Sequence, residues 1–375
     1  MQLVECVPNF SEGRNQVVID AIAQAVASVS TVRLLDVDSG PGANRTVVTF
    51  AGAPDVVLES AFRAIECASN LIDMRNHRGA HPRLGATDLC PFVPLHGVAM
   101  SDCVKLAERL GERVAEELDI PIFLYGEAAR MPERRALPDV RRGEYEGLAS
   151  RFRLPGSVPD YGNATFNASA GATIIGARPI LIAFNVNLDT RLKNVAQAIA
   201  AKVRESGSMV KDADGNTLRL PNGSVYRKAG SLKSCRAIGW YIDEYECAQV
   251  STNLIDCKTT SLHQAFSEIA RQAELMGVGV TGSEIIGMVP LRAMTEAGKY
   301  FAGLNSESKV QRTQSSEKSE SISSTQGRTT SSECESELLE LAIESLGLRK
   351  VRNFVSEKKV IEYSLAEYGL LDVLS

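Results

Sequence analysis

The sequence has 375 residues, of which 44% are hydrophobic and 23% charged, a composition typical of folded globular proteins. Because single hydrophobic cores stop growing at roughly 250–300 residues, this length predicts two domains. The formal net charge of −5 gives no overall attraction to nucleic-acid phosphates or acidic membranes, so we expect neither partner. Neither a secretory signal nor a run of about 18 apolar residues is present, which favours a cytoplasmic protein.

Strand and helix patterns alternate along the first half of the chain. A strand is expected over residues 2–7, and Asn15 can cap the helix that follows. The remaining patterns predict strands over 32–37 and 46–52, a helix from Pro54 towards Ile72, an extended segment over 89–95, a helix over 101–118 and a strand over 120–125.

The second half repeats this rhythm with different residues. Its patterns predict a strand over 180–188, a helix over 191–204, strands over 236–242 and 248–255, a helix over 261–275 and a strand over 278–286. Each half therefore approximates a split βαβ unit, which builds a mixed sheet with helices on one face. The expected fold class is α/β (α+β), with two such subdomains whose sheets face each other across a ligand cleft.

The composition divides the C-terminal part of the chain. Residues 303–336 are rich in Ser, Glu, Lys, Thr and Gln, and we expect a disordered insertion there. We therefore assign residues 1–178 to a first subdomain, and residues 179–302 together with 337–375 to a second. After the insertion, SELLELAIESLGL (336–348) has helical periodicity, and KKVIEYSL (358–365) is expected to be a strand.

The segment RNHRGAHPRLGATD (75–88) has the highest density of potential catalytic side chains. A histidine exchanges protons near neutral pH, and arginines bind carboxylates through two parallel hydrogen bonds. The segment therefore suits an anionic substrate that undergoes proton-coupled transfer. A surface loop whose histidines bind backbone carbonyls explains the same residues, and the pattern alone does not exclude it.

His77 and His81 are four residues apart, a spacing that would place two zinc ligands on one face of a helix. Gly79 and Pro82 argue against a helix, and the general-base Glu of H-E-x-x-H is missing. We therefore expect no metal site, although a metal hydrolase remains an alternative that chelators would reveal.

Two other segments are candidates for the site. Asp36 and Asp38 end the LLDVD strand on the same face, where either carboxylate could orient an imidazole or bind the following turn. The stretch PDYGNATFNASAGATIIGARP (159–179) is rich in small residues, which allow close backbone approach to a flat ring but also suit an interdomain linker. Its order matches neither a phosphate loop nor a dinucleotide fingerprint.

Long segments of this chain closely resemble the glutamate formimidoyltransferases of histidine degradation. The resemblance covers about residues 1–302 and resumes near 337–365, so the Ser-rich insertion lies outside the family pattern. It rests on QLVECVPNFSEGRNQVVIDAI (2–22), LLDVDSGPGANRTVVTFAG (34–52), LIDMRNHRGAHPRLGATDLCPF (71–92), EELDIPIFLYGEAARMPERR (116–135) and GWYIDEYECAQVSTNLID (239–256).

The resemblance implies a site as well as a fold. In that family, two α/β subdomains face each other around a positively charged tunnel that holds folate. The catalytic histidine of the family's H-P-R motif falls on His81, and the assisting aspartate falls on Asp38. The folate-contacting segment aligns with Gly162, Asn163, Ala164, Thr165, Phe166, Asn167, Ala168, Ser169, Ala170 and Gly171.

The resemblance also implies the cofactors and partners. The family uses tetrahydrofolate as co-substrate, favours its polyglutamylated forms, needs no metal and forms homodimers. In mammals the domain is fused to a cyclodeaminase, which is expected here as a separate partner.

The expected reaction moves a formimino group between N-formimino-L-glutamate and N5 of tetrahydrofolate. His81 would act as general acid and base, with Asp38 supporting it. Arg75, Arg78 and Arg83 are candidate clamps for the substrate carboxylates. Two alternatives stay open, namely formyl transfer between the same partners and a folate-binding carrier without catalysis.

Overall fold

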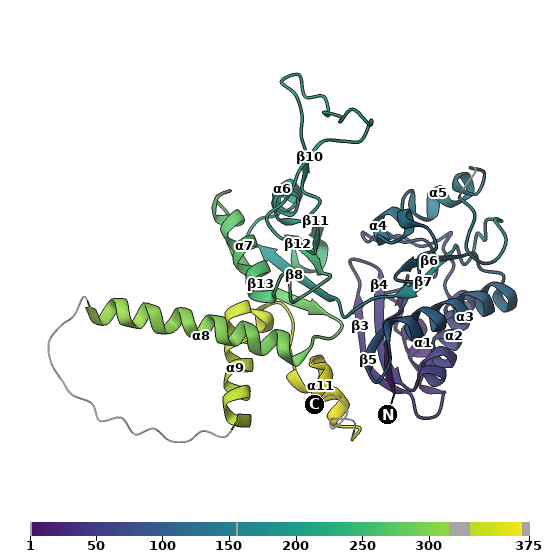
Figure 1. Ribbon diagram of the computed structural model, residues 1–375, viewed down its shortest axis with the longest axis horizontal. Helices are drawn as coiled ribbons and strands as arrows, with labels where there is room; N and C mark the ends of the chain where they lie inside the picture. Colours follow the sequence, from purple (N-terminus) through teal and green to yellow (C-terminus); the bar gives the residue numbers. More distant parts are fainter. Residues whose placement is uncertain (1, 155–156, 315–330, 370–375) are drawn as a thin grey trace.

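The structure is a computed structural model that describes residues 2–154, 157–314 and 331–369. These residues form two large sheets with separate hydrophobic cores and one small two-stranded sheet (Figure 1). One core is built from residues between 4 and 177, and the other from residues between 182 and 360. The two halves of the chain therefore fold around their own cores.

The first half forms a seven-stranded sheet in the order β1-β4-β2-β5-β7-β6, with β3 paired to β4. The β5–β7 and β6–β7 pairings are parallel and the others antiparallel, so the sheet is mixed as expected. Its strands are β1 (Leu3–Cys6), β2 (Asn9–Phe10), β3 (Arg33–Gly40), β4 (Arg45–Gly52), β5 (Thr87–His96), β6 (Ile122–Gly126) and β7 (Thr173–Ala177).

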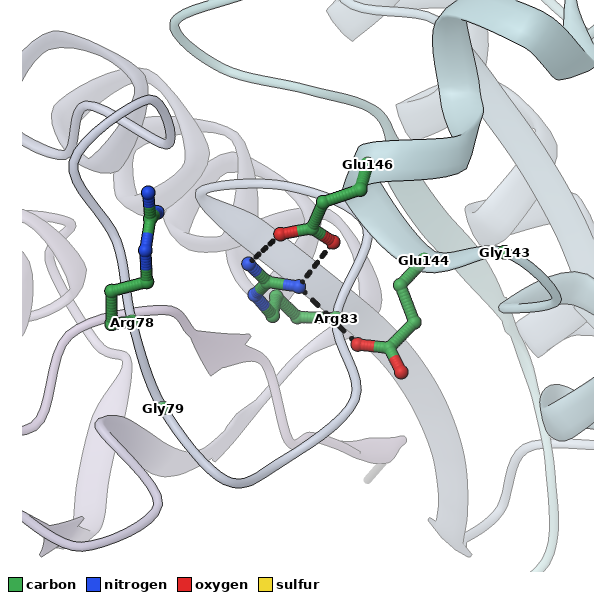
Figure 2. A pocket seen from close by; sticks show the side chains of 6 residues that line it. All are labelled: Arg78, Gly79, Arg83, Gly143, Glu144 and Glu146. Carbon is green, nitrogen blue, oxygen red and sulfur yellow. Dashed lines mark hydrogen bonds and ion pairs between the residues drawn. The ribbon is translucent and has the colours of Figure 1, made fainter.

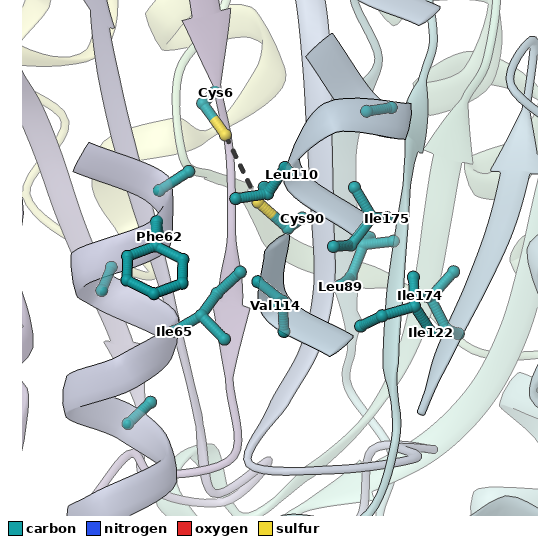
Figure 3. Close-up of a cluster of buried hydrophobic side chains, with 14 of the residues drawn as sticks. Cys6, Phe62, Ile65, Leu89, Cys90, Leu110, Val114, Ile122, Ile174 and Ile175 are labelled. Carbon is teal, nitrogen blue, oxygen red and sulfur yellow. Dashed lines mark hydrogen bonds between the residues drawn. The ribbon is translucent and has the colours of Figure 1, made fainter. Parts of the chain in front are cut away.

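Three long helices cover one face of this sheet: α1 (Gln16–Ala27), α2 (Pro54–Leu71) and α3 (Met100–Leu118). Asn15 caps α1 as predicted, because its side chain accepts a hydrogen bond from the backbone of Val17. Figure 3 shows Phe62 of α2 and Leu110 of α3 beside Cys6 and Cys90, whose sulfur atoms lie 3.5 Å apart. The opposite face of the sheet is left open towards the second half.

The second half forms a four-stranded sheet in the order β11-β12-β8-β13. Its elements are β8 (Ile182–Leu188), α6 (Lys193–Val203), β11 (Cys235–Ile242), β12 (Cys247–Leu254), α7 (Leu262–Glu274) and β13 (Val280–Ile286), in the predicted chain order. The mixed sheet predicted for this half is wrong, because β12 lies between β8 and β11 and runs opposite to both, and β13 runs opposite to β8, so every pairing is antiparallel. Helices α6 and α7 lie on one of its faces.

Helices replace the strand expected over 358–365. The chain forms α10 (Ser356–Lys359) and α11 (Ile361–Ala366), and only Val360 bridges to Val289. Ile361, Ser364 and Leu365 are buried at helical spacing, and α11 packs its apolar side chains on the first sheet beside Leu3. The prediction was wrong because a short apolar run does not distinguish a strand from a buried helix.

Several elements were not predicted. Short helices α4 (Leu137–Val140) and α5 (Glu144–Arg151) precede β7, and an arm with β9 (Ser208–Met209) and β10 (Arg227–Lys228) extends from the second subdomain (Figure 1). Helix α8 (Leu291–Gln314) extends into the first end of the Ser-rich segment, and α9 (Ser331–Leu346), which confirms the helical periodicity predicted over 336–348, extends into its second end. Residues 315–330, the centre of the predicted insertion, lie outside the described residues.

Candidate active site

The open faces of the two sheets line one cavity of about 590 Å³. Successive side chains of a strand point to opposite faces of its sheet, so each strand contributes alternately to a core and to the cavity. In β8, for example, Phe184 and Val186 point into the second core, whereas Asn185 lines the cavity. Seven arginines line the cavity, at positions 45, 135, 141, 142, 178, 236 and 352, together with six carboxylates, at positions 5, 38, 127, 144, 244 and 284. The cavity therefore combines apolar surface with many charged side chains.

His81 lies at the wall of this cavity, on the loop between α2 and β5. Gly79 lets this loop approach the 42–44 turn, because a Cβ at position 79 would lie 2.3 Å from the carbonyl oxygen of Ala43. The Nδ1 atom of His81 lies 2.7 Å from the carbonyl oxygen of Pro82. A carbonyl oxygen can only accept a hydrogen bond, so Nδ1 carries the proton. The unprotonated Nε2 has no hydrogen-bond partner among the described residues.

The surroundings of His81 keep its ring neutral. Its ring centroid lies 6.0 Å from that of Trp240, which comes from β11 of the second subdomain. Burial lowers the pKa of His81 well below its ordinary value, and the nearby Arg45 and Arg141 lower it further. At neutral pH the ring is therefore a base that can take up a proton.

Asp88, the second residue of β5, is fully buried near His81. Its carboxylate accepts hydrogen bonds from Arg45 (2.7 Å), Arg141 and the backbone NH of Leu84 (2.8 Å). Burial raises the pKa of Asp88, but Arg141 and Arg45 outweigh it and hold that pKa well below its usual range. Two cations share one carboxylate, so this cluster keeps a net positive charge next to His81.

Asp38 lies on the cavity face but is not hydrogen-bonded to His81. Its carboxylate accepts from Arg352 (2.6 Å), Lys359 (2.8 Å) and the backbone NH of Gly287 (3.0 Å). Burial raises the pKa of Asp38, but Lys359 and Arg352 lower it below its ordinary value overall. Because three donors from the second subdomain occupy this carboxylate, Asp38 joins the two halves of the molecule instead of orienting the imidazole.

The second subdomain contributes a hydrogen-bonded network of side chains centred on the amide of Gln249. Gln249 of β12 is completely buried, accepts a hydrogen bond from Trp240 Nε1 (2.7 Å), and donates to Asn187 (2.6 Å) and Glu284 (2.9 Å). Glu284 in turn accepts from Tyr245 (2.9 Å). The network fixes the indole ring that faces His81.

His77 has a structural role. Its Nε2 atom lies 2.9 Å from the carbonyl oxygen of Asn44, and its Nδ1 accepts a hydrogen bond from Arg83 at 3.1 Å. Both ring nitrogens are therefore occupied, and neither is free to join His81 as a metal ligand. Across the described part of the chain, no group of three or more His, Cys, Asp or Glu residues is arranged to hold a metal ion.

None of the three arginines predicted as carboxylate clamps lines the main cavity. Arg75 pairs with Asp73 at 2.7 Å on the surface. Arg83 is buried and pairs with Glu146 at 2.6 Å and with Glu144 at 3.2 Å. Figure 2 shows both carboxylates on the guanidinium of Arg83 in a separate small pocket, with Arg78 turned away from them. Acidic neighbours already occupy Arg75 and Arg83, and their role as clamps stays untested.

The predicted folate segment, Gly162–Gly171, lies where β6 and β7 begin. Asn167 donates a hydrogen bond to the carbonyl of Asp119 at 3.2 Å, and the ring of Phe166 packs 5.4 Å from that of Tyr145. The carbonyl of Ala170 accepts a hydrogen bond from Ala86 at 2.8 Å, which ties the segment to the loop that carries His81. None of its ten residues lines the main cavity, and folate contact there stays a prediction.

Comparison with known proteins places the chain in a family. The formiminotransferase domain, N-terminal subdomain, matches residues 3–178, and the formiminotransferase domain matches residues 183–320. A glutamate formimidoyltransferase from Streptococcus pyogenes serotype M1 is 40% identical over 80% of this chain and 93% of its own length. The chain belongs to the formiminotransferase family.

Other relatives of the chain are longer. The formimidoyltransferase-cyclodeaminase of Rattus norvegicus is 44% identical over 98% of the chain but 61% of its own length, and that of Mus musculus is 43% identical with the same coverage. The chain thus spans about three fifths of these relatives. A solved microcompartment protein from Desulfitobacterium hafniense DCB aligns with a TM-score of 0.20 and 12% identity, which is too low to inform the fold.

The sequence interpretation missed most of the wall around His81. Arg45, Arg141 and Trp240 come from segments far from the histidine loop, and no local pattern connects them to it. Trp240 offered one signal, since it is the only tryptophan of the chain and lies in an alternating strand. In the described residues, no helix is long and apolar enough to cross a membrane.

Proposed function

We propose that this chain transfers a formimino group between N-formimino-L-glutamate and N5 of tetrahydrofolate, as part of histidine degradation. The observation that carries the proposal is the free Nε2 of His81, a neutral base in a cavity lined by both subdomains. The activities named for related proteins support the same reaction class. The cavity volume of about 590 Å³ is in the range typical of small-molecule sites.

The chemistry requires one proton to move between two nitrogens. N5 of tetrahydrofolate attacks the formimino carbon and gives a tetrahedral adduct. Nε2 of His81 takes the proton from N5 and delivers it to the glutamate nitrogen, so that the bond from carbon to that nitrogen breaks and glutamate leaves. Because Nδ1–H stays hydrogen-bonded to the carbonyl oxygen of Pro82, the ring can repeat this proton exchange without rotating.

The neighbouring charges support the binding of an anionic substrate. The two positive charges of Arg45 and Arg141 exceed the single negative charge of Asp88. A glutamate carboxylate near His81 therefore gains electrostatic stabilisation. In this proposal, Asp38 supports catalysis indirectly, because its ion pairs with Arg352 and Lys359 hold the second sheet over the cavity.

The remaining parts of the proposal concern the cell. We place the enzyme in the cytoplasm as a homodimer that uses polyglutamylated tetrahydrofolate and passes its product to a separate cyclodeaminase. Size-exclusion chromatography with light scattering would measure the oligomeric state directly.

The decisive experiment is an assay of the purified chain with formiminoglutamate and tetrahydrofolate. We expect turnover by the wild type, and a loss of about 10²–10⁴ in kcat for His81→Ala because general acid–base catalysis is removed. Tetrahydrofolate binding, measured by calorimetry, should be retained in the variant. Wild-type rates in His81→Ala would exclude this histidine as the proton carrier.

A further inference from the structure

The loop that carries His81 is joined to α5 by Arg83, the second residue after the histidine. Arg83 is buried, and its guanidinium donates two parallel hydrogen bonds to Glu146, at 2.6 and 2.8 Å, and a longer one of 3.2 Å to Glu144 (Figure 2). Both carboxylates belong to the first turn of α5. Two separate parts of the chain are therefore held together two positions away from the proposed base.

The same guanidinium is hydrogen-bonded to the other histidine of the loop. Its Nε donates to Nδ1 of His77 at 3.1 Å, so that Nδ1 carries no proton, and Nε2 of the ring donates to the carbonyl oxygen of Asn44 at 2.9 Å. Burial lowers the pKa of His77, which keeps the ring neutral and able to accept from Arg83. Through His77, Arg83 therefore connects α5 with the turn between β3 and β4.

The backbone at Arg83 also controls the proton of His81. The carbonyl of Pro82, which accepts from Nδ1 of His81 at 2.7 Å, belongs to the peptide group that Pro82 shares with Arg83. The carbonyl of Arg83 itself accepts a hydrogen bond from the backbone NH of Tyr145 at 2.9 Å. Peptide groups are planar and each residue has only two free backbone dihedral angles. Holding the side chain and the carbonyl of Arg83 therefore restricts the direction in which the carbonyl of Pro82 can point.

The backbone of α5 is strained at the point where it contacts Arg83. Gly143 and Glu144 have φ angles of 85° and 54°, both in the left-handed region. Glycine adopts this conformation readily, but the Cβ atom makes it unfavourable for Glu144. Both residues line the small pocket of Figure 2 as well as the main cavity. A strained residue at such a border indicates that the contact it makes, here with Arg83, has a function.

From these contacts we propose that Arg83 is a positioning residue for His81. Its ion pair with Glu146 holds the peptide group between Pro82 and Arg83, and the carbonyl of Pro82 then keeps the proton on Nδ1 and leaves Nε2 of His81 free in the main cavity. The inference rests on the proposed function. It replaces the role of carboxylate clamp, because hydrogen bonds to the two glutamates and to His77 use four of the five N–H groups of the guanidinium.

The first test is the kinetics of Arg83→Gln, which removes the ion pair but keeps a polar side chain. We expect kcat to fall roughly 10- to 100-fold, because a small misplacement of a catalytic group has an effect of this size. The KM values for formiminoglutamate and tetrahydrofolate should stay unchanged, since no substrate contact is lost. Arg83→Lys keeps the charge but not the two parallel hydrogen bonds, and should recover part of kcat. A raised KM for formiminoglutamate with an unchanged kcat would overturn the proposal in favour of a clamp.

Glu146→Gln tests the same pair from the side of α5, and the exposed position of Glu146 favours normal folding of this variant. Its kcat should also fall, and the double variant with Arg83→Gln should lose no more than Arg83→Gln alone, because both changes remove one ion pair. Arg349→Gln is the matched control, since Arg349 forms two hydrogen bonds of 2.6 and 2.9 Å with Glu340 in the second subdomain. Additive losses in the double variant, or an equal loss in the control, would overturn the proposal.

The protonation site of His81 is a readout that does not depend on activity. The chain has four histidines, so the NMR signals of isotope-labelled imidazoles can be assigned by substituting each in turn. Long-range nitrogen–proton spectra should show the proton of His81 on Nδ1 in the wild type and partly on Nε2 in Arg83→Gln. This result supports the positioning role even when the wild type shows no formimino transfer, which would count against the proposed function alone. A proton that stays on Nδ1 in Arg83→Gln would overturn the proposal even if kcat falls.

Discussion

The two walls of the cavity are built on different physical principles. The wall from the first subdomain is charged, with Asp88 held between Arg45 and Arg141 next to His81. The wall from the second subdomain facing it contains amide side chains around Gln249, and these hold the indole of Trp240 in place. The first wall supplies charge and the reactive group, whereas the second removes water from that group and keeps it neutral.

This difference explains why the loop that carries His81 would not form the proposed site on its own. Burial is the largest influence on the pKa of His81, and the ring of Trp240 from the other subdomain is one of the groups packed against it. The arginines of the first wall act in the same direction but less strongly. A histidine loop on one sheet therefore becomes a base of the right character only when the second sheet is in place.

The largest effect is expected from breaking the charged wall. Asp88→Ala leaves Arg45 and Arg141 buried without their carboxylate, which should lower the free energy of unfolding by about 3–5 kcal/mol. Urea denaturation measures this loss. Glu340→Ala is the control, because Glu340 pairs with Arg349 at the surface, where such a pair contributes about 0–1 kcal/mol. Similar losses in both variants would show that the buried cluster has no special role.

A smaller effect is expected from breaking the amide wall. Gln249→Leu keeps the volume but leaves the indole NH of Trp240 and the amide of Asn187 without partners, at a cost of about 1–3 kcal/mol. The free energy of unfolding and kcat/KM should both fall. Ser251→Ala, on the same strand and cavity face, removes no side-chain hydrogen bond between described residues and should change neither quantity. Unchanged stability in Gln249→Leu would mean that the network does not stabilise this wall.

The comparison of the walls also shows what the sequence could predict. The order of helices and strands followed from apolar periodicity, and the dense loop around His81 was found because its residue types are clustered along the chain. The charged wall was not found, since Arg45 and Asp88 are 43 residues apart and meet only after β4 and β5 fold into one sheet. Local patterns carry no information about such pairs.

The same limit explains why the ion pairs of Asp38 were not predicted. Its partner Lys359 is 321 residues away, in a segment predicted to be a strand but folded as helix, so the ion pair could not be anticipated. The acidic partners of Arg83 were missed for a related reason. Its acidic partner Glu146 lies on α5, a helix that the sequence patterns did not reveal.

The mildest test of the two-wall arrangement is the pH dependence of the reaction. A base must be neutral to accept a proton, so kcat/KM falls as the pH drops through the pKa of His81. Because that pKa lies well below 6.5, the wild type should keep its rate at about pH 6, where an ordinary histidine is mostly protonated. Trp240→Ala admits water to the ring, raises the pKa, and should move the acid limb to higher pH. An unmoved limb would mean that the second wall does not set the pKa of this histidine.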